Sequence, residues 1–283
     1  MNTEDLENVK TYDTFSPSGT KWNRDPKVSR YMTLPSLLSL LHRRKLHFSK
    51  LSDLCAFDRH EGVGGLMNNI VQDPISSGLS ICPSTPVFEA EQAAIVARVK
   101  KELQIPYEEQ LPEFKAKVAK WDQENTNVYV SSWHENFGDT YFMWRVYSRD
   151  DHGVAIASSA QDLVHSFVGV DLESEKIGFG FVVYPYRDVL IRDHLTEGHY
   201  ALPPFLIKTK SFEAEREFRV FVQTKVAVDS CDMEVDLNKL IHEVRISPLA
   251  APWIDEAVRA TLNPICEKLG IPVAQREQSL REP

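Results

Sequence analysis

Short segments of β-forming residues recur along the chain, and they limit the folds that it can adopt. Residues 127–133 alternate between the two faces of a strand, and residues 153–157 and 217–228 are rich in β-branched and aromatic side chains. Further short strands are predicted at 29–32, 45–49, 177–184 and 243–247. Regular strand–helix–strand units are too few for a doubly wound parallel sheet. The sequence therefore predicts an α+β fold with a small central sheet.

Helical spacing appears only in short runs between these segments and in one longer run near the end. The first helix face consists of Leu34, Leu37, Leu38 and Leu41. Thr33 is expected to cap this helix, and Pro35 fits only in its first turn. The last helix is predicted to begin at Pro252 and to end at Gly270, with a kink at Pro264. Its buried residues are expected to be Trp253, Ala257, Val258, Leu262, Ile265 and Leu269.

Composition limits the class of protein. The 283 residues include 42% hydrophobic ones, which is enough to fill a core and excludes a disordered chain. With 32 Lys+Arg and 41 Asp+Glu the net charge is −9, which excludes a broad basic surface for nucleic acid but leaves room for one local basic groove. We expect one mixed domain over 28–275 with a helical insert at 88–122. A polar lead-in (1–27), a long loop (62–86) and a polar tail (276–283) complete the predicted organisation.

The sequence predicts a cytoplasmic location and no membrane contact. No apolar run approaches the length of about 18 residues that a membrane helix needs, and residues 1–10 lack the features of a secretory signal. The four cysteines are far apart and none is in a C-x-x-C pair, so we expect buried reduced thiols and no metal site.

Polar and aromatic residues gather where the 127–133 strand ends. The run 132–136 reads Ser-Trp-His-Glu-Asn, and Trp144 follows in a short helix predicted around residues 141–147. His134 beside Glu135 is a candidate acid–base group, although adjacent strand residues point to opposite faces. The alternative is that Trp133 and Trp144 are core aromatics and that His134 is structural.

A second candidate cluster begins at Glu213. If the segment is extended, Glu213, Glu215, Glu217 and Arg219 lie on one strand face. Carboxylates two residues apart repel unless a cation lies between them, and such crowding is typical of catalytic acids and bases. The alternatives are a solvated face with local ion pairs or, before Glu217, a helical segment. The third cluster is Arg30-Tyr31 on the first strand, where a planar guanidinium suits a phosphate.

Several of these blocks resemble a large family of uncharacterised bacterial proteins that share a domain of unknown function. The matching blocks are Arg30-Tyr31-Met32, Arg59-His60-Glu61-Gly62, Trp133-His134-Glu135-Asn136, Met143 to Tyr147, Gly153 to Ile156, Glu215 to Arg219, and Val244 to Pro248. They run from about residue 28 to about residue 270.

The order of the elements also resembles that of ADP-ribosyltransferases, with a polar first strand and a late Glu-x-Glu strand. This resemblance implies that Arg30 contacts NAD, that Glu217 is the key carboxylate and that Glu215 orients the acceptor. The remaining members of the implied site are His134 as a catalytic residue and Tyr31, Trp133, Trp144 and Arg219 as cofactor-binding residues.

The implied function is an NAD-using ADP-ribosyltransferase or NAD glycohydrolase, acting in bacterial conflict as a toxin or in antiviral defence. Its small-molecule partner would be a nucleotide, and its acceptor a protein, a nucleic acid or water. Two alternatives stay open. One is a metal-dependent nuclease or phosphodiesterase that uses Glu215, Glu217, His134 and Glu135. The other is a non-catalytic ligand sensor or adaptor of a defence system.

Overall fold

The computed structural model describes residues 25–57, 126–135, 141–147, 152–170, 177–184, 204–206, 208 and 210–274. The chain divides into two compact units. Unit 1 comprises Met1–Lys50, Asn127–Val182 and Ala214–Pro283, and unit 2 comprises Leu51–Thr126 and Val183–Glu213. The predicted insert at 88–122, the loop at 62–86, the tail and most of the lead-in lie outside the described residues. The prediction of one domain with an insertion stays a prediction.

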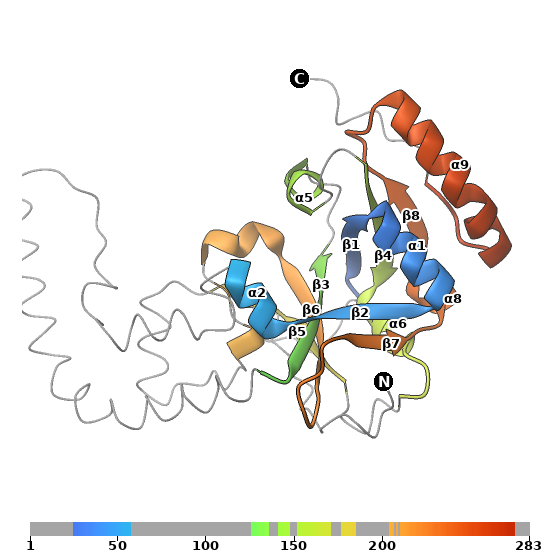
Figure 1. Cartoon of the computed structure of the whole chain (residues 1–283). Coiled ribbons are helices and arrows are strands. Elements are labelled where there is room, and N and C mark those ends of the chain that lie inside the picture. The colour runs from blue at the N-terminus through green and yellow to red at the C-terminus, as the bar shows by residue number, and fades with distance from the viewer. Residues whose placement is uncertain are drawn as a thin grey trace, which may run out of the picture. The chain divides into compact units, whose positions relative to one another are not determined.

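Unit 1 is built on an antiparallel sheet (Figure 1). Its strands lie in the order β5 (Gly178–Phe181), β6 (Glu217–Gln223), β3 (Val128–Glu135), β1 (Lys27–Thr33), β4 (Gly153–Ser159) and β8 (Glu243–Ile246). The first four residues of β2 (Lys45–Lys50) pair with β7 (Cys231–Glu234), and its last two residues pair with the start of β3. Strands and short helices are mixed along the chain, which confirms the prediction of an α+β fold.

The helices of unit 1 follow the predicted boundaries where capping residues mark them. They are α1 (Leu34–Arg43), α5 (Tyr141–Tyr147), α6 (Ala160–His165), α8 (Leu237–Leu240) and α9 (Pro252–Leu269). The Thr33 hydroxyl accepts a hydrogen bond from the Ser36 amide at 3.4 Å, and Pro35 lies in the first turn of α1. Gly270 ends α9 with a φ of 71°, a left-handed conformation that favours glycine.

The buried stripe of α9 contains Val258 and Leu262 as expected and otherwise differs from the prediction. Its buried residues are Ile254, Val258, Leu262 and Cys266, which are spaced four residues apart along one helix face. Trp253, which we expected to be buried, is 69% exposed, and Ala257 is also exposed. Each precedes a buried residue by one position, so it lies about 100° around the helix from the stripe.

The sheet of unit 1 has two chemically different faces. The core face carries Val28, Met32, Trp133, Ile156, Phe218, Val220, Val222 and Val244. It packs with α1, α6, α8 and α9 into one hydrophobic core. The polar face carries Ser29, Tyr31, Ser132, His134, Glu217, Arg219 and Arg245. Helix α5 packs Met143 and Trp144 against Tyr31 and Ala155 on this polar face.

In unit 2 the structure describes α2 (Leu51–Phe57) and, within 183–213, residues 183–184, 204–206, 208 and 210–213. The Val183 amide donates to the Leu206 carbonyl at 2.9 Å, and the Lys208 amide donates to the Val183 carbonyl at 3.0 Å. The Lys208 ammonium lies 5.1 Å from the centre of the Phe212 ring, which is a cation–π distance.

Candidate functional site

Buried charged and polar side chains meet on the polar face where β3 and β6 pair. Glu217 lies directly opposite His134, and Arg219 lies directly opposite Ser132. His134 in turn lies opposite Ser29 of β1. Residues directly opposite each other in an antiparallel ladder share one face of the sheet, so these side chains form one neighbourhood. Buried polar groups of this kind are unusual in a sheet that needs only a core, and they mark a candidate site.

Glu217 and Arg219 form a buried ion pair along β6. Arg219 Nε donates to Glu217 Oε2 at 2.6 Å, and the two side chains are 1% and 6% exposed. They are two residues apart on one strand, so both point to the polar face. The guanidinium supplies the opposite charge that a buried carboxylate needs in order to stay ionised. The pair therefore holds a negative charge in place below the surface.

The hydrogen bonds of His134 define its tautomer. Its Nδ1 lies 2.6 Å from the carbonyl oxygen of Glu215, and because a carbonyl only accepts, Nδ1 carries the proton. Among the residues that the structure describes, none makes a hydrogen bond to Nε2, which holds the lone pair of the neutral ring. Burial lowers the pKa of His134 below its usual value of 6.5, and this effect outweighs the hydrogen bond to the Glu215 carbonyl, which raises the pKa. The neutral ring is thus the main form at pH 7, with Nε2 as a base.

The segment before β6 is helical, which was one of the alternatives for the Glu-rich run. A 3-10 helix covers Lys210–Glu215, so Glu213 and Glu215 do not lie on the strand with Glu217. Glu213 is exposed and binds Lys210 at 2.5 Å. The expected strand face with three carboxylates was therefore wrong, because the run changes from helix to strand at Arg216.

The backbone turns sharply at Arg216, and the carboxylates on either side of it, Glu215 and Glu217, are both buried. Arg216 has a φ of 41°, which non-glycine residues rarely adopt and which often occurs at functional sites. Its carbonyl accepts from the amide of Glu135 at 2.9 Å, which fixes the turn to the end of β3. Glu215 and Glu217 are 6% and 5% exposed. The Tyr147 hydroxyl donates to Glu215 Oε1 at 2.6 Å, so the two carboxylates have different partners.

Aromatic rings cover this neighbourhood from the side of α5. The rings of Tyr31 and Trp144 meet edge to face with their centres 4.8 Å apart. The Tyr31 ring also meets the His134 ring, at 6.1 Å. On the far side of Tyr31, Arg245 donates to the Ser29 hydroxyl. The polar face and α5 thus bring together a carboxylate, an imidazole, two guanidinium groups and two aromatic rings.

The structure brings together six of the eight residues that the sequence assigned to a site. Those on or beside the polar face are Glu217, Glu215, His134, Tyr31, Trp144 and Arg219. Arg30 and Trp133 lie on the core face instead. The pairing of Ser29 with His134 puts Ser29 and Glu217 on one face, and Arg30, the next residue, points to the other. Arg30 and Glu217, which the transferase resemblance puts in one site, are separated by the sheet.

Trp133 has the environment of a core aromatic. It is fully buried, and its Nε1 donates to the Ser131 hydroxyl at 3.0 Å. This is the structural alternative that the sequence left open for this tryptophan.

Sequence reasoning missed Tyr147 and Arg245 as neighbours of the site. Arg245 alternates with the buried Val244 and Ile246 on β8, so the alternation already put it on the other face of its strand. The sequence did not show which residues that face meets, because β8 pairs with β4, a strand far away in the sequence. Tyr147 ends a helix whose neighbours only the fold decides.

The described side chains form no cluster of metal ligands. Within the described ranges, no group of three or more His, Cys, Asp or Glu side chains is close enough to hold a metal ion. Cys231 and Cys266 are buried thiols, and burial raises the pKa of Cys231 to about 12. The expectation of buried reduced thiols is confirmed for these two.

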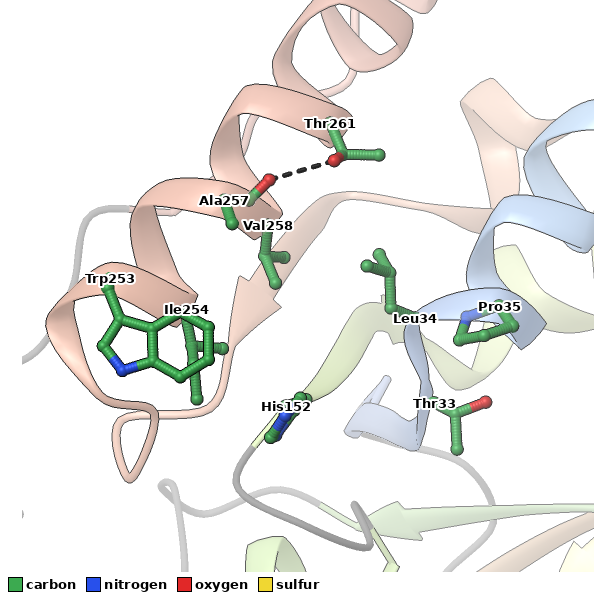
Figure 2. Close-up of a pocket in the computed structure, with 9 residues that line it drawn as sticks. All are labelled: Thr33, Leu34, Pro35, His152, Trp253, Ile254, Ala257, Val258 and Thr261. Carbon is green, nitrogen blue, oxygen red and sulfur yellow. Dashed lines mark hydrogen bonds between the residues drawn. The ribbon is translucent and has the colours of Figure 1, made fainter.

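Unit 1 also contains two cavities that Glu217, His134 and Arg219 do not line. One, of about 320 Å³, lies between the start of α1 and α9, and Figure 2 shows Leu34 on one wall, Val258 on the other and His152 below them. The exposed Trp253 ring lies at its edge. The other, of about 550 Å³, lies beside Arg30 and is more polar.

No helix in the described part of the chain has the length and apolar character needed to cross a membrane. Comparison of the chain with models of protein families, with curated proteins and with solved structures finds no match.

Proposed function

We propose that the polar face is the active site of an enzyme that cleaves the glycosidic bond of a nucleotide, with NAD as the substrate to test first. The observation that supports this proposal is the pairing of Glu217, held beside Arg219, with a neutral His134 directly opposite it. An ionised carboxylate and an unprotonated imidazole on one face are the two groups that glycosidic cleavage and transfer require.

Glu217 would stabilise the charge that develops on the substrate. When the bond between ribose C1′ and the nicotinamide nitrogen breaks, the electron pair leaves with nicotinamide and positive charge develops at C1′ and the ring oxygen. A carboxylate fixed near that position stabilises the transition state more than the ground state. Arg219 keeps Glu217 ionised and oriented, so little reorganisation is needed when the charge appears.

His134 would activate the attacking group. Nε2 accepts a proton from water or from an acceptor hydroxyl as its oxygen bonds to C1′, and the imidazolium then releases that proton to solvent. With water the products are ADP-ribose and nicotinamide, and with a protein or nucleic acid the product is a modified acceptor. The hydrogen bond from Nδ1 to the Glu215 carbonyl holds the ring in the tautomer that this step needs.

The remaining groups suit the other parts of the substrate. The Tyr31 ring, packed edge to face on the fully buried Trp144, would present the aromatic surface to nicotinamide, and Arg245, on the same face, would offer a positive charge to the pyrophosphate. We also propose that the chain has an ADP-ribosyltransferase-like fold and that it belongs to the bacterial family whose sequence blocks it resembles. Since NAD consumption harms a cell, we propose a role as a toxin or in antiviral defence.

The test is NAD consumption by the whole protein and by two matched Glu→Gln variants. Glu217→Gln keeps the shape of the side chain and removes its charge, and we expect it to lower kcat by roughly 10²–10³-fold. The control is Glu213→Gln, the same change at an exposed residue that binds Lys210, and it should keep the wild-type rate. Equal rates for wild type and Glu217→Gln would show that the site is wrong. A wild-type protein that leaves NAD intact would contradict the substrate.

A further inference from the structure

The cavity of about 550 Å³ on the core-face side lies between β1, α1, β2 and the start of β7. Its volume is in the range of small-molecule sites, which is about 300–1,000 Å³. Apolar side chains, Met32, Leu40 and Leu46, form part of its wall. Polar side chains line other parts of it, and they include three cations and two hydroxyl groups: Arg30, Arg43, Lys45, Ser39 and Ser230.

Arg30 is a partly buried cation with neutral partners. Its Nη1 donates to the Ser131 hydroxyl at 2.8 Å, and its Nη2 donates to the His47 carbonyl at 3.1 Å. Within the described residues it makes no ion pair with a carboxylate. Burial lowers the pKa of Arg30 to about 10, so it is still charged at pH 7. Because a desolvated cation without an opposite charge is costly, this guanidinium suits an anionic ligand.

The one carboxylate on the cavity wall is already neutralised. Asp232 accepts from Arg43 at 2.5 Å and lies 2.9 Å from Nδ1 of His47. Burial would raise the pKa of Asp232, but these hydrogen bonds outweigh it and lower the pKa. Lys45 lies opposite Glu234 in the β2–β7 ladder, and no ion pair between the two is found in the described structure. With Arg43 and Asp232 cancelling, Arg30 and Lys45 leave this wall positive in a protein of net charge −9.

We propose that this cavity is a second ligand site, specific for a small molecule that carries a phosphate group. The planar fork of Arg30 can bind two phosphate oxygens at once, and Lys45 and the Ser39 hydroxyl supply further donors from the neighbouring walls. The apolar part of the wall would contact the organic part of the ligand. Glu217 lies on the opposite face of the sheet, so a ligand held here does not take part in the proposed reaction.

The experiment is calorimetric titration of the whole protein with inorganic pyrophosphate, and with AMP and adenosine as a matched pair. We expect saturable binding of pyrophosphate and AMP, and at least roughly tenfold weaker binding of adenosine, since it lacks the charged group. Absence of heat from both phosphate probes at millimolar concentration would overturn the proposal. Equal affinities for AMP and adenosine would overturn it as well.

Two variants on the cavity wall assign the binding to this place. Lys45→Gln removes a charge, and Ser39→Asp adds a repelling carboxylate at an exposed position of α1, so neither change needs to disturb the core. Each should weaken pyrophosphate binding by roughly tenfold. The control is Lys27→Gln, an exposed lysine of β1 outside the cavity, which should bind as wild type does. If Lys27→Gln weakens binding as much as Lys45→Gln, the attraction is a diffuse effect of charge and the site is wrong.

Discussion

The two faces of the sheet in unit 1 are both buried, yet their chemistry differs. The core face is filled by apolar side chains such as Val220 and Ile156, which pack with the helices that cover them. The polar face buries Glu217, Arg219 and His134, and α5 packs against it at Tyr31 and Ala155. Burial of apolar area stabilises a fold, whereas burial of charge costs free energy that pairing only partly offsets. The core face therefore supplies apolar burial that stabilises unit 1, and the charged groups of the polar face are the basis of the proposed function.

The largest expected effect comes from breaking the ion pair on the polar face. Arg219→Leu leaves the Glu217 carboxylate buried without its cation, and we expect a loss of about 3–5 kcal/mol in the free energy of unfolding. Denaturant titration followed by circular dichroism measures it. The double variant Arg219→Leu/Glu217→Leu removes both charges and should lose less than the single one. A single variant that is as stable as wild type would show that the pair does not hold the polar face.

A medium effect is expected at Gly178 of β5, which packs on Phe221. A Cβ at Gly178 would lie 2.2 Å from the ring of Phe221, which is opposite it in the ladder and fully buried. Gly178→Ala should therefore lower the free energy of unfolding by about 1–3 kcal/mol. Adding Phe221→Leu makes room and should recover part of the loss, as thermal unfolding can measure. If Gly178→Ala unfolds at the wild-type temperature, β5 does not pack on Phe221 as described.

The smallest effect is the pH dependence that His134 causes. Its pKa in the folded protein lies below the usual 6.5, so the unfolded chain binds the proton more readily. Above pH 6.5 both states are neutral and His134 contributes no slope. As pH falls from 6.5 through the folded pKa, stability falls, by about 1.4 kcal/mol for each unit of pKa difference. Denaturant titrations at several pH values measure this slope, which should be smaller in His134→Asn. An unchanged slope in that variant would contradict a buried neutral ring.

Local features of the fold were predictable because neighbouring residues determine them. The cap at Thr33, the first-turn Pro35 and the left-handed Gly270 depend on the backbone within a few residues, and all three are confirmed. The α9 stripe was predicted in part: Val258 and Leu262 are buried as expected, but Trp253 and Ala257 are exposed, since the sequence offers apolar residues on two adjacent helix faces and only the core selects one.

The candidate site was predictable only in part. Alternation along β6 correctly put Glu217 and Arg219 on one face, which their ion pair confirms. The same rule puts Arg30 on the other face of β1 from Ser29 and Tyr31. It does not say which face of β1 lies on the same side of the sheet as a given face of β6. Strand β3, which lies between them, decides that through its registers with β1 and with β6.

By itself the sequence determined the types of element, their caps and the side of each strand on which a residue lies, because these depend on spacing along the chain. The tertiary structure alone decided that Glu217 and His134 face each other while Arg30 lies across the sheet from them. The physical reason is that a shift of one residue in pairing exchanges the two faces of a strand. Such a register is selected by the burial of the whole sheet and not by any one segment.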